Sequence, residues 1–214
     1  MKKFLNYILD LIYKKKCYFC GSSKENVTMC SECFEDISYT DIKAERIYNN
    51  VNIYCACEYS NNIQKLIRGL KYHNRPELAY YQAKIMFDYW QKLGLNQNFQ
   101  LVPVPLHKNR KHKRKYNHME LVAEEFCKLT GYETNFELIK RTKDTKPQYK
   151  LSKKERMENL KNAFEVDKTK LQDAKILILD DICTTGSTFE SIIQELNQNG
   201  ITDIVCFATS SPRG

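Results

Sequence analysis

Two adjacent carboxylates and a loop of small residues are the side chains of this sequence best suited to chemistry. Residues 176–179 are apolar and predict a short buried parallel strand. Asp180 and Asp181 follow directly, and a helix is predicted over 189–199, with Gly200 just beyond its end. The loop between them consists of Thr184, Thr185, Gly186, Ser187 and Thr188. Because ligands of open α/β sheets bind beyond the carboxyl ends of strands, this corner is the predicted ligand site.

The chemistry of this corner suits a sugar phosphate. A small-residue loop at a helix N-terminus offers N–H groups and hydroxyls to phosphate, and paired carboxylates suit vicinal hydroxyls or a largely hydrated Mg²⁺ ion. Segment 176–188 resembles the phosphoribosyl-pyrophosphate (PRPP) signature of type I phosphoribosyltransferases. The alternative is the loop of another doubly wound fold, with both carboxylates merely exposed. A nucleotide-binding Walker loop is excluded, because no Gly-Lys-[Ser/Thr] follows the strand.

A second candidate site lies near the N-terminus, where four cysteines form two C-x2-C pairs. These are Cys17, Cys20, Cys30 and Cys33. Paired C-x2-C knuckles hold Zn²⁺ through four thiolates in a closed structural site. Disulfides or a redox-active pair are the alternatives. A structural zinc ion would supply roughly 10–16 kcal/mol to a segment with almost no core of its own.

The remaining N-terminal residues and cysteines favour a cytoplasmic protein. Residues 4–12 predict an amphipathic helix that packs on the domain or touches a membrane; Asp10 interrupts its apolar stretch, which argues against an export signal. No stretch is apolar enough to span a bilayer. The other cysteines suit a reducing compartment; they are Cys55, Cys57, Cys127, Cys183 and Cys206. Cys55 and Cys57 are expected to share one strand face, as a metal pair or as two buried small side chains.

The pattern along the chain predicts one α/β domain behind a small module. With 214 residues, the chain divides into a helix and zinc module over 1–45 and a larger domain over 46–214. Strands are predicted near 51–59, 99–104, 175–179 and 203–208, with helices between them from Asn61, from Pro76 and over 118–129, the last closed by Gly131. This alternation predicts a mostly parallel sheet flanked by helices. A net charge of +8 favours anionic partners.

Further motifs indicate which family of proteins this sequence resembles. Residues 102–107 read Val-Pro-Val-Pro-Leu-His and are followed by Arg110, and residues 114–118 read Arg-Lys-Tyr-Asn-His. A Pro147-Gln148 pair with Arg156 and Asn159 comes later. In this order, and with the knuckles and the PRPP signature, the chain resembles the ComF family (ComFC type), the bacterial phosphoribosyltransferase-like competence proteins, from about residue 17 onward. The family usually has R-G-F-N-Q at 114–118, so only the arginine and the asparagine match there.

The resemblance implies a type I phosphoribosyltransferase fold and a ligand site for PRPP with Mg²⁺. Lys108 and Arg110 would face the pyrophosphate, since both side chains bind phosphate, and residues 140–161 would form a hood over the ligand. If the protein is an enzyme, pyrophosphate is displaced at the anomeric carbon while Asp180 and Asp181 stabilise the developing positive charge. No residue pattern identifies an acceptor, so turnover stays open.

Basic residues add a nucleic-acid hypothesis. Lys111, Lys113, Arg114 and Lys115 form a basic run, and Tyr149 and Phe164 lie in or beside a second basic segment. Cations interleaved with aromatics bind single strands. With the family resemblance, this predicts a protein that handles single-stranded DNA in natural transformation. The alternatives are a catalytic phosphoribosyltransferase, or a non-catalytic scaffold that contacts other DNA uptake proteins.

Overall fold

The structure is a computed structural model that describes residues 15–95, 97–107, 109, 116–143 and 153–212. The predicted helix at 4–12 lies outside these residues, as do Lys108, Arg110, Tyr149 and the basic run 111–115. Within the described part of the chain, no helix combines the length and the apolar character that crossing a membrane requires.

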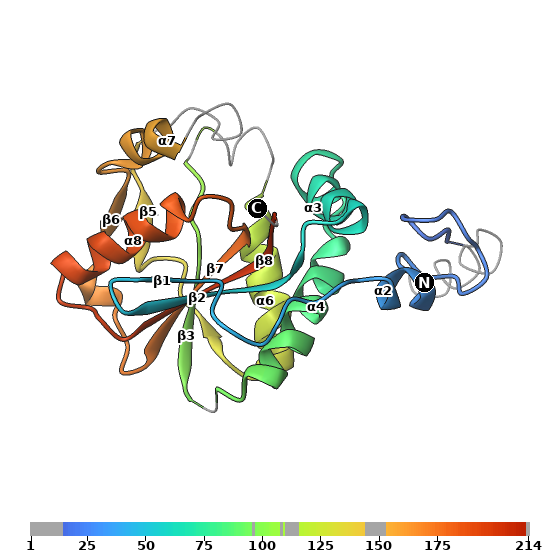
Figure 1. Ribbon diagram of the computed structural model, residues 1–214, viewed down its shortest axis with the longest axis horizontal. Coiled ribbons are helices and arrows are strands. Elements are labelled where there is room, and N and C mark those ends of the chain that lie inside the picture. Colours follow the sequence, from blue (N-terminus) through green and yellow to red (C-terminus); the bar gives the residue numbers. More distant parts are fainter. Residues whose placement is uncertain (1–14, 96, 108, 110–115, 144–152, 213–214) are drawn as a thin grey trace, which may run out of the picture.

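A six-stranded sheet forms the centre of the fold (Figure 1). Its order is β1 (Arg46–Tyr48), β2 (Val51–Glu58), β8 (Ile204–Ser211), β7 (Lys175–Ile182), β3 (Phe99–Pro103) and β4 (Glu133–Thr134). Only β1 and β2 pair antiparallel, and the other four neighbouring pairs are parallel. This confirms the predicted mostly parallel α/β sheet. The three central strands end at the same edge, since Leu101 pairs with Leu177 and Leu177 pairs with Val205.

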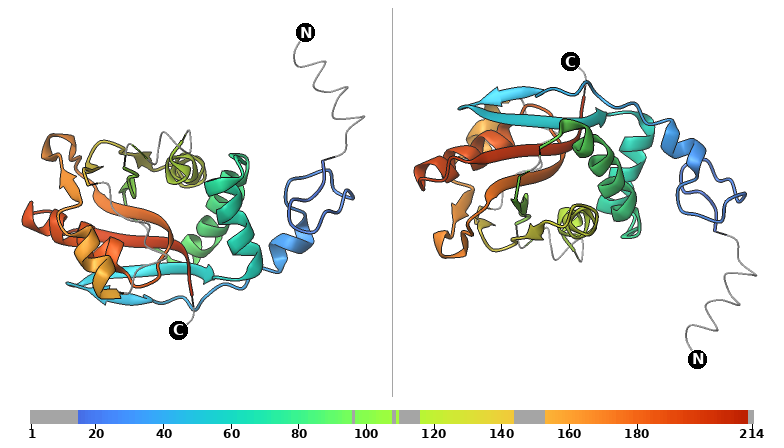
Figure 2. Two further views of the ribbon diagram at one scale, coloured as in Figure 1. Left: turned by 90° about the horizontal axis from the view of Figure 1, so that it is seen from above. Right: turned by 90° about the horizontal axis from the view of Figure 1, so that it is seen from below.

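Helices cover both faces of the sheet (Figures 1 and 2). One face carries α4 (Leu78–Leu93) and α6 (His118–Thr130), with α3 (Asn61–Tyr72) beside them; the other carries α8 (Ser187–Gln198). A smaller unit packs against α8. It consists of the antiparallel pair β5 (Ile139–Arg141) and β6 (Phe164–Val166), the helix α7 (Lys153–Leu160) and the short η2 (Lys168–Lys170).

The helix ends show how far local sequence signals reach. Gly131 and Gly200 follow α6 and α8 with φ of +79° and +80°, the left-handed conformation that closes a helix. The sequence also suggests Asn61 as the N-cap of α3, but Ser60 is the cap and Asn61 is the first residue of the helix. The helix expected from Pro76 begins at Leu78, although Pro76 already accepts a hydrogen bond from the amide of Ala79 at 3.0 Å.

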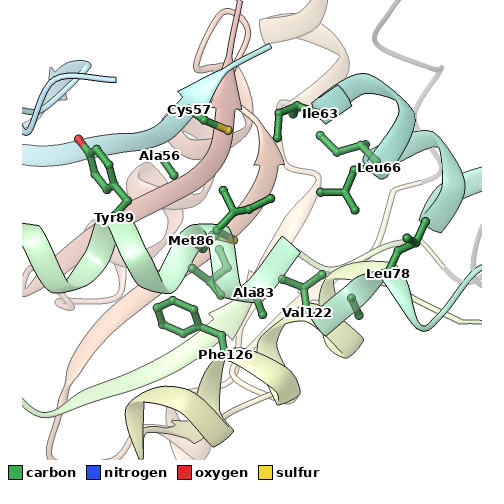
Figure 3. Close-up of a cluster of buried hydrophobic side chains, with 14 of the residues drawn as sticks. Ala56, Cys57, Ile63, Leu66, Leu78, Ala83, Met86, Tyr89, Val122 and Phe126 are labelled. Carbon is green, nitrogen blue, oxygen red and sulfur yellow. The ribbon is translucent and has the colours of Figure 1, made fainter. Parts of the chain in front are cut away.

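The larger apolar core lies between the sheet and helices α3, α4 and α6 (Figure 3). The Trp90 ring is its centre: its centroid lies 5.3 Å from those of Phe99 and Phe207, and 6.2 Å from that of Phe126. Each such buried side chain contributes about 1.5–3 kcal/mol relative to exposure. Cys55 and Cys57 are both buried, which fits two buried small side chains; Cys57 belongs to this core, whereas Cys55 belongs to a second cluster with residues of α8.

The cysteine module packs on this same core. Cys17, Cys30 and Cys33 are buried in the cluster that also holds residues of α3 and α4. Tyr18 contributes directly, because its hydroxyl hydrogen-bonds with His73 Nδ1 at 2.8 Å. The short helix α2 (Ser31–Glu35) starts at the second knuckle. Docking against α3 therefore supplies the apolar contacts that the module lacks by itself.

Candidate phosphoribosyl site

The predicted ligand loop lies where β7 ends and α8 begins. Gly186 has φ of +83°, a conformation that favours glycine, and it is the N-cap of α8. The hydroxyls of Thr185 and Ser187 hydrogen-bond at 2.8 Å. Thr184 and Thr188 complete the loop, so the structure brings the five predicted residues together at one helix N-terminus. Such a terminus presents N–H groups and a positive dipole end to an anion.

Arg46, on the edge strand β1, holds this loop. Its guanidinium donates hydrogen bonds to the carbonyl oxygens of Thr185 and Thr184, at 2.6 and 2.8 Å. It also lies beside Gly186, since a Cβ added there would come within 3.6 Å of Arg46 Nη1. The same Cβ would come within 3.5 Å of Glu190 Oε1, so a carboxylate also lies near this guanidinium. Arg46 therefore orients the loop through its two carbonyl contacts.

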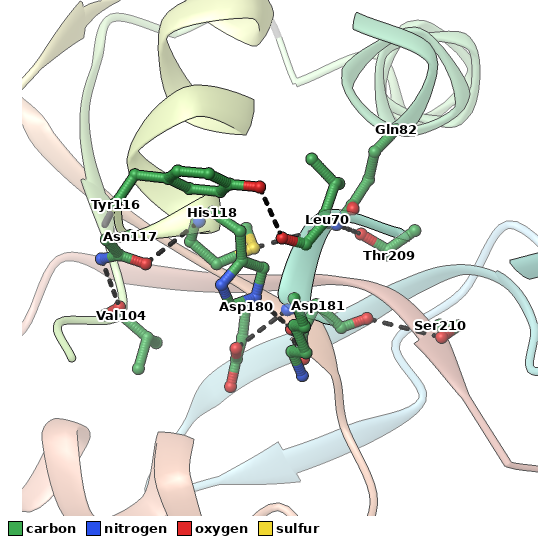
Figure 4. A network of polar contacts seen from close by, with 12 residues as sticks. Leu70, Gln82, Val104, Tyr116, Asn117, His118, Asp180, Asp181, Thr209 and Ser210 are labelled. Carbon is green, nitrogen blue, oxygen red and sulfur yellow. Dashed lines mark hydrogen bonds and ion pairs between the residues drawn. The ribbon is translucent and has the colours of Figure 1, made fainter. Parts of the chain in front are cut away.

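The two predicted carboxylates have different surroundings (Figure 4). Asp181 is buried, and its Oδ2 lies 2.5 Å from both Lys71 Nζ and His118 Nε2. Burial acts to raise the pKa of Asp181, but the Lys71 charge and the His118 hydrogen bond outweigh it and hold that pKa below its usual range. Asp181 is thus an ionised carboxylate already bound by two protein side chains.

Asp180 is partly exposed and is the carboxylate more available to a ligand. Its Oδ1 accepts a hydrogen bond from the amide of Asp181 at 2.9 Å. Burial and the neighbouring Asp181 charge raise the pKa of Asp180 to about 7, against the opposing charges of Lys71 and Arg141. Two adjacent carboxylates rarely ionise equally well, and here Lys71 and His118 favour ionisation of Asp181.

The site also depends on residues that sequence patterns did not reveal. Lys71 from α3 and His118 from α6 contact Asp181 on β7, and the charge of Arg141 from β5 acts on Asp180. Asn117 caps α6 by accepting a hydrogen bond from the Met119 amide at 3.1 Å, which fixes the start of the helix that carries His118. His118 stands where the ComF pattern usually has glutamine. This departure from the pattern was the one feature of the sequence that could have drawn attention to His118.

The four cysteines of the second predicted site converge. Their sulfur atoms all lie within 4.8 Å of one another. The Cys17–Cys33 and Cys20–Cys30 sulfur pairs are 3.8 and 3.7 Å apart. Thiolates bound tetrahedrally at about 2.3 Å from zinc lie about 3.8 Å apart. Burial opposes ionisation of these thiols and raises the pKa of Cys33, whereas hydrogen bonds from the Cys20 and Cys30 amides lower the pKa of Cys17 to about 6. Chemistry and geometry both fit a structural zinc ion.

A mostly parallel sheet with a small-residue loop and carboxylates at its carboxyl edge is the arrangement of phosphoribosyltransferase-like α/β proteins. Comparison with known proteins agrees, because residues 110–209 match the family model described as "PRTase ComF-like". Residues 110–209 are therefore similar to a ComF-like phosphoribosyltransferase domain, which confirms the resemblance drawn from the motifs.

Relatives match over most of the chain. "DNA utilization protein YhgH" of Escherichia coli (strain K12) is 27% identical over 86% of this chain and 85% of its own length. "Competence protein F" of Haemophilus influenzae is 26% identical over 88% of this chain and 86% of its own length. "Competence protein ComFC" of Bacillus subtilis is 24% identical over 86% and 72%, respectively. Among solved structures, "Structure of the allosteric regulatory enzyme of purine biosynthesis" aligns with 66% of this chain and 30% of its own, at 12% identity and a TM-score of 0.43, which is too weak for any conclusion.

Proposed function

We propose that this chain binds PRPP with Mg²⁺ at the β7–α8 corner and handles single-stranded DNA during natural transformation. The main support for PRPP binding is the loop at 184–188, which is held by Arg46 and flanked by Asp180. The loop N–H groups and hydroxyls would bind the 5′-phosphate, and Asp180 would hydrogen-bond the ribose hydroxyls. Lys108 and Arg110 remain predicted contacts to the pyrophosphate.

The charges around Asp180 suit this ligand. The charges of Lys71 and Arg141 act to lower the pKa of Asp180, so the electrostatic surroundings of this carboxylate include two cations. Mg²⁺, when bound with PRPP, would neutralise the pyrophosphate. Asp181 would hold Lys71 and His118 in place rather than contact the ribose, since both already bind its Oδ2. In this proposal, Asp180 alone takes the role at the ribose that was predicted for both carboxylates.

Calorimetric titration of PRPP with and without Mg²⁺ tests the ligand. Thr185→Val removes a loop hydroxyl and should weaken binding by about tenfold, the value of roughly one hydrogen bond. Thr169→Val is the matched control, because Thr169 lies on η2 and its hydroxyl binds Asp167 outside the site. Equal PRPP affinity of the two variants would overturn the assignment.

Catalysis is a second candidate, favoured by the pKa of Asp180. A carboxyl with a pKa of about 7 can take up or release a proton at neutral pH. In a transfer reaction, Asp180 would stabilise positive charge on the ribose as pyrophosphate leaves. A pyrophosphate-release screen across bases, amines and DNA, with Asp180→Asn as the inactive comparison, would identify an acceptor.

Support for the DNA half comes from the relatives and from charge. The names of the relatives refer to DNA utilization and competence, and the net charge of +8 favours polyanions. Lys111, Lys113, Arg114 and Lys115 remain predicted contacts. We place the protein in the cytoplasm, where reducing conditions keep thiols available for zinc.

A further inference from the structure

Helix α3 concentrates positive charge on its solvent side. Residues 61–72 contain no aspartate or glutamate, and of their three cations Lys71 pairs with Asp181 while Lys65 and Arg68 face solvent. The apolar side of the helix is buried in the main core. Lys65, Arg68 and Tyr72 are exposed, and their spacing of three and four residues puts them on one stripe. We call these three residues the α3 track.

Tyr72 gives the track a stacking surface. Its side chain is 61% exposed, although it is large and aromatic. Lys65 and Arg68 precede it on the same stripe, so a ring and two cations face solvent together. The stripe from Lys65 to Tyr72 is about 10 Å long at 1.5 Å per residue, which accommodates about two or three nucleotides at a spacing of 3.4 Å or more.

The contacts of the track leave its charge uncompensated on the side of the cysteine module. Lys65 Nζ donates to the carbonyl of Phe19 at 2.8 Å and lies 5.3 Å from the centroid of the Tyr18 ring. Both partners are neutral, so they orient the ammonium group without cancelling its charge. Arg75 lies 5.0 Å from the same ring, but its charge is paired with Glu77 at 2.5 Å, so Lys65 supplies the positive charge at this edge.

The opposite edge of the track leads to the ligand site. Lys71, next to Tyr72 in sequence, reaches Asp181 at 2.5 Å. Helix α3, which carries the track, therefore lies between the cysteine module and the strand that ends at the β7–α8 corner (Figures 1 and 2).

We propose that the α3 track binds a short stretch of single-stranded nucleic acid, with phosphates on Lys65 and Arg68 and an unpaired base on Tyr72. The inference rests on the DNA half of the proposed function and gives it a surface outside the basic run 111–115. Cations with an exposed aromatic ring suit single strands, because bases of a duplex are already stacked on one another.

Fluorescence anisotropy with a labelled oligothymidine of about 20 nucleotides tests the track. Tyr72→Ala should weaken binding by about 5- to 150-fold, whereas Tyr72→Phe, which keeps the ring, should bind like the wild type. Arg68→Gln should reduce the slope of log affinity against log salt by about 0.7, the value of one phosphate contact. Single strands should compete better than duplex of the same length.

Two control variants match these changes. Tyr80→Ala removes an aromatic side chain of 46% exposure from α4, and Lys168→Gln removes an exposed cation from η2; both should bind DNA normally. Every variant should keep the wild-type rise in melting temperature with PRPP, which shows that its fold and ligand site are intact.

The outcomes separate the track from the proposed function. If the wild type binds DNA and the double variant Tyr72→Ala, Arg68→Gln binds it equally well, the proposal that the α3 track binds DNA is wrong, while the proposed DNA function of the protein stands. If duplex competes as well as single strands, the stacking role of Tyr72 is wrong. If the wild type binds no DNA, both the track and the DNA function fail, and the PRPP titration still decides the ligand site.

Discussion

Lys71 Nζ lies 2.5 Å from Asp181 Oδ2, in a pair whose side chains are 18% and 6% exposed. The pair joins α3, which also contacts the cysteine module, to the strand that ends in the ligand loop. His118 Nε2 binds the same carboxylate oxygen at the same distance. Two adjacent carboxylates can thus differ in their surroundings, since Asp181 is held by two protein side chains and Asp180 is partly exposed.

Removing one member of this pair should destabilise the fold. Lys71→Met leaves Asp181 buried with one partner fewer, at a cost of about 3–5 kcal/mol in the free energy of unfolding. Adding Asp181→Asn removes the orphaned charge, so the double variant should be more stable than the sum of the single losses predicts. Urea unfolding of the four proteins measures this coupling. Strictly additive losses would show that the two side chains do not interact.

Asp180 should make stability depend on pH in the opposite sense to a typical carboxylate. Its pKa is raised to about 7 by burial and by Asp181, whereas an unfolded aspartate has a pKa of about 4. Its contribution to stability is therefore complete below about pH 4 and is lost as the pH rises through about 7. Asp180→Asn cannot ionise, so its melting temperature relative to wild type should rise between pH 5 and pH 8.

An exposed carboxylate provides the comparison for this pH effect. Asp173 is exposed in the loop before β7. Asp173→Asn should follow the wild-type pH profile across the same range. A melting-temperature difference between Asp180→Asn and wild type that stays flat with pH would contradict a raised pKa.

The sequence predicted the parts of the site that are contiguous and missed those assembled by the fold. The strand, loop and helix at 175–198 were predictable, because an apolar run, small loop residues and Gly200 are local signals. Arg46 reaches Thr185 across 139 positions, and no local pattern reports such a contact. The different surroundings of Asp180 and Asp181 also depend on α3 and α6. The adjacency of the two residues in the sequence does not reveal these contacts.

Zinc should stabilise more than the cysteine module. Because Cys17, Cys30 and Cys33 share a core with α3 and α4, loss of the metal should lower the melting temperature of the whole chain. Protein prepared under reducing conditions without chelator should contain about one zinc per chain by elemental analysis. Cys30→Ser should lose the metal, whereas Cys127→Ser should keep it, since Cys127 lies on α6 away from the cluster. Metal-free wild type would refute the zinc site.

Arg46 should control ligand affinity without touching the ligand. Its bonds to the Thr184 and Thr185 carbonyls fix the direction of the loop, and a hydrogen bond with a charged partner is worth about 1.5–3 kcal/mol. If loop order is needed to bind PRPP, Arg46→Ala should weaken binding by roughly 10- to 100-fold. Arg46→Lys keeps the charge but cannot bind both carbonyls in a fork, so its affinity should be intermediate.

A control variant at Lys43 distinguishes the effect of Arg46 on the ligand loop from a general effect on folding. Lys43→Ala removes a cation from the same N-terminal connection, where Lys43 pairs with Asp41 on the surface, and should leave PRPP affinity unchanged. Zinc content should be the same in all these variants, because Arg46 donates its hydrogen bonds to the loop carbonyls and not to the four clustered cysteines. If Arg46→Ala binds PRPP as tightly as Lys43→Ala, the loop keeps its conformation unaided, and the ligand site needs only β7 and α8.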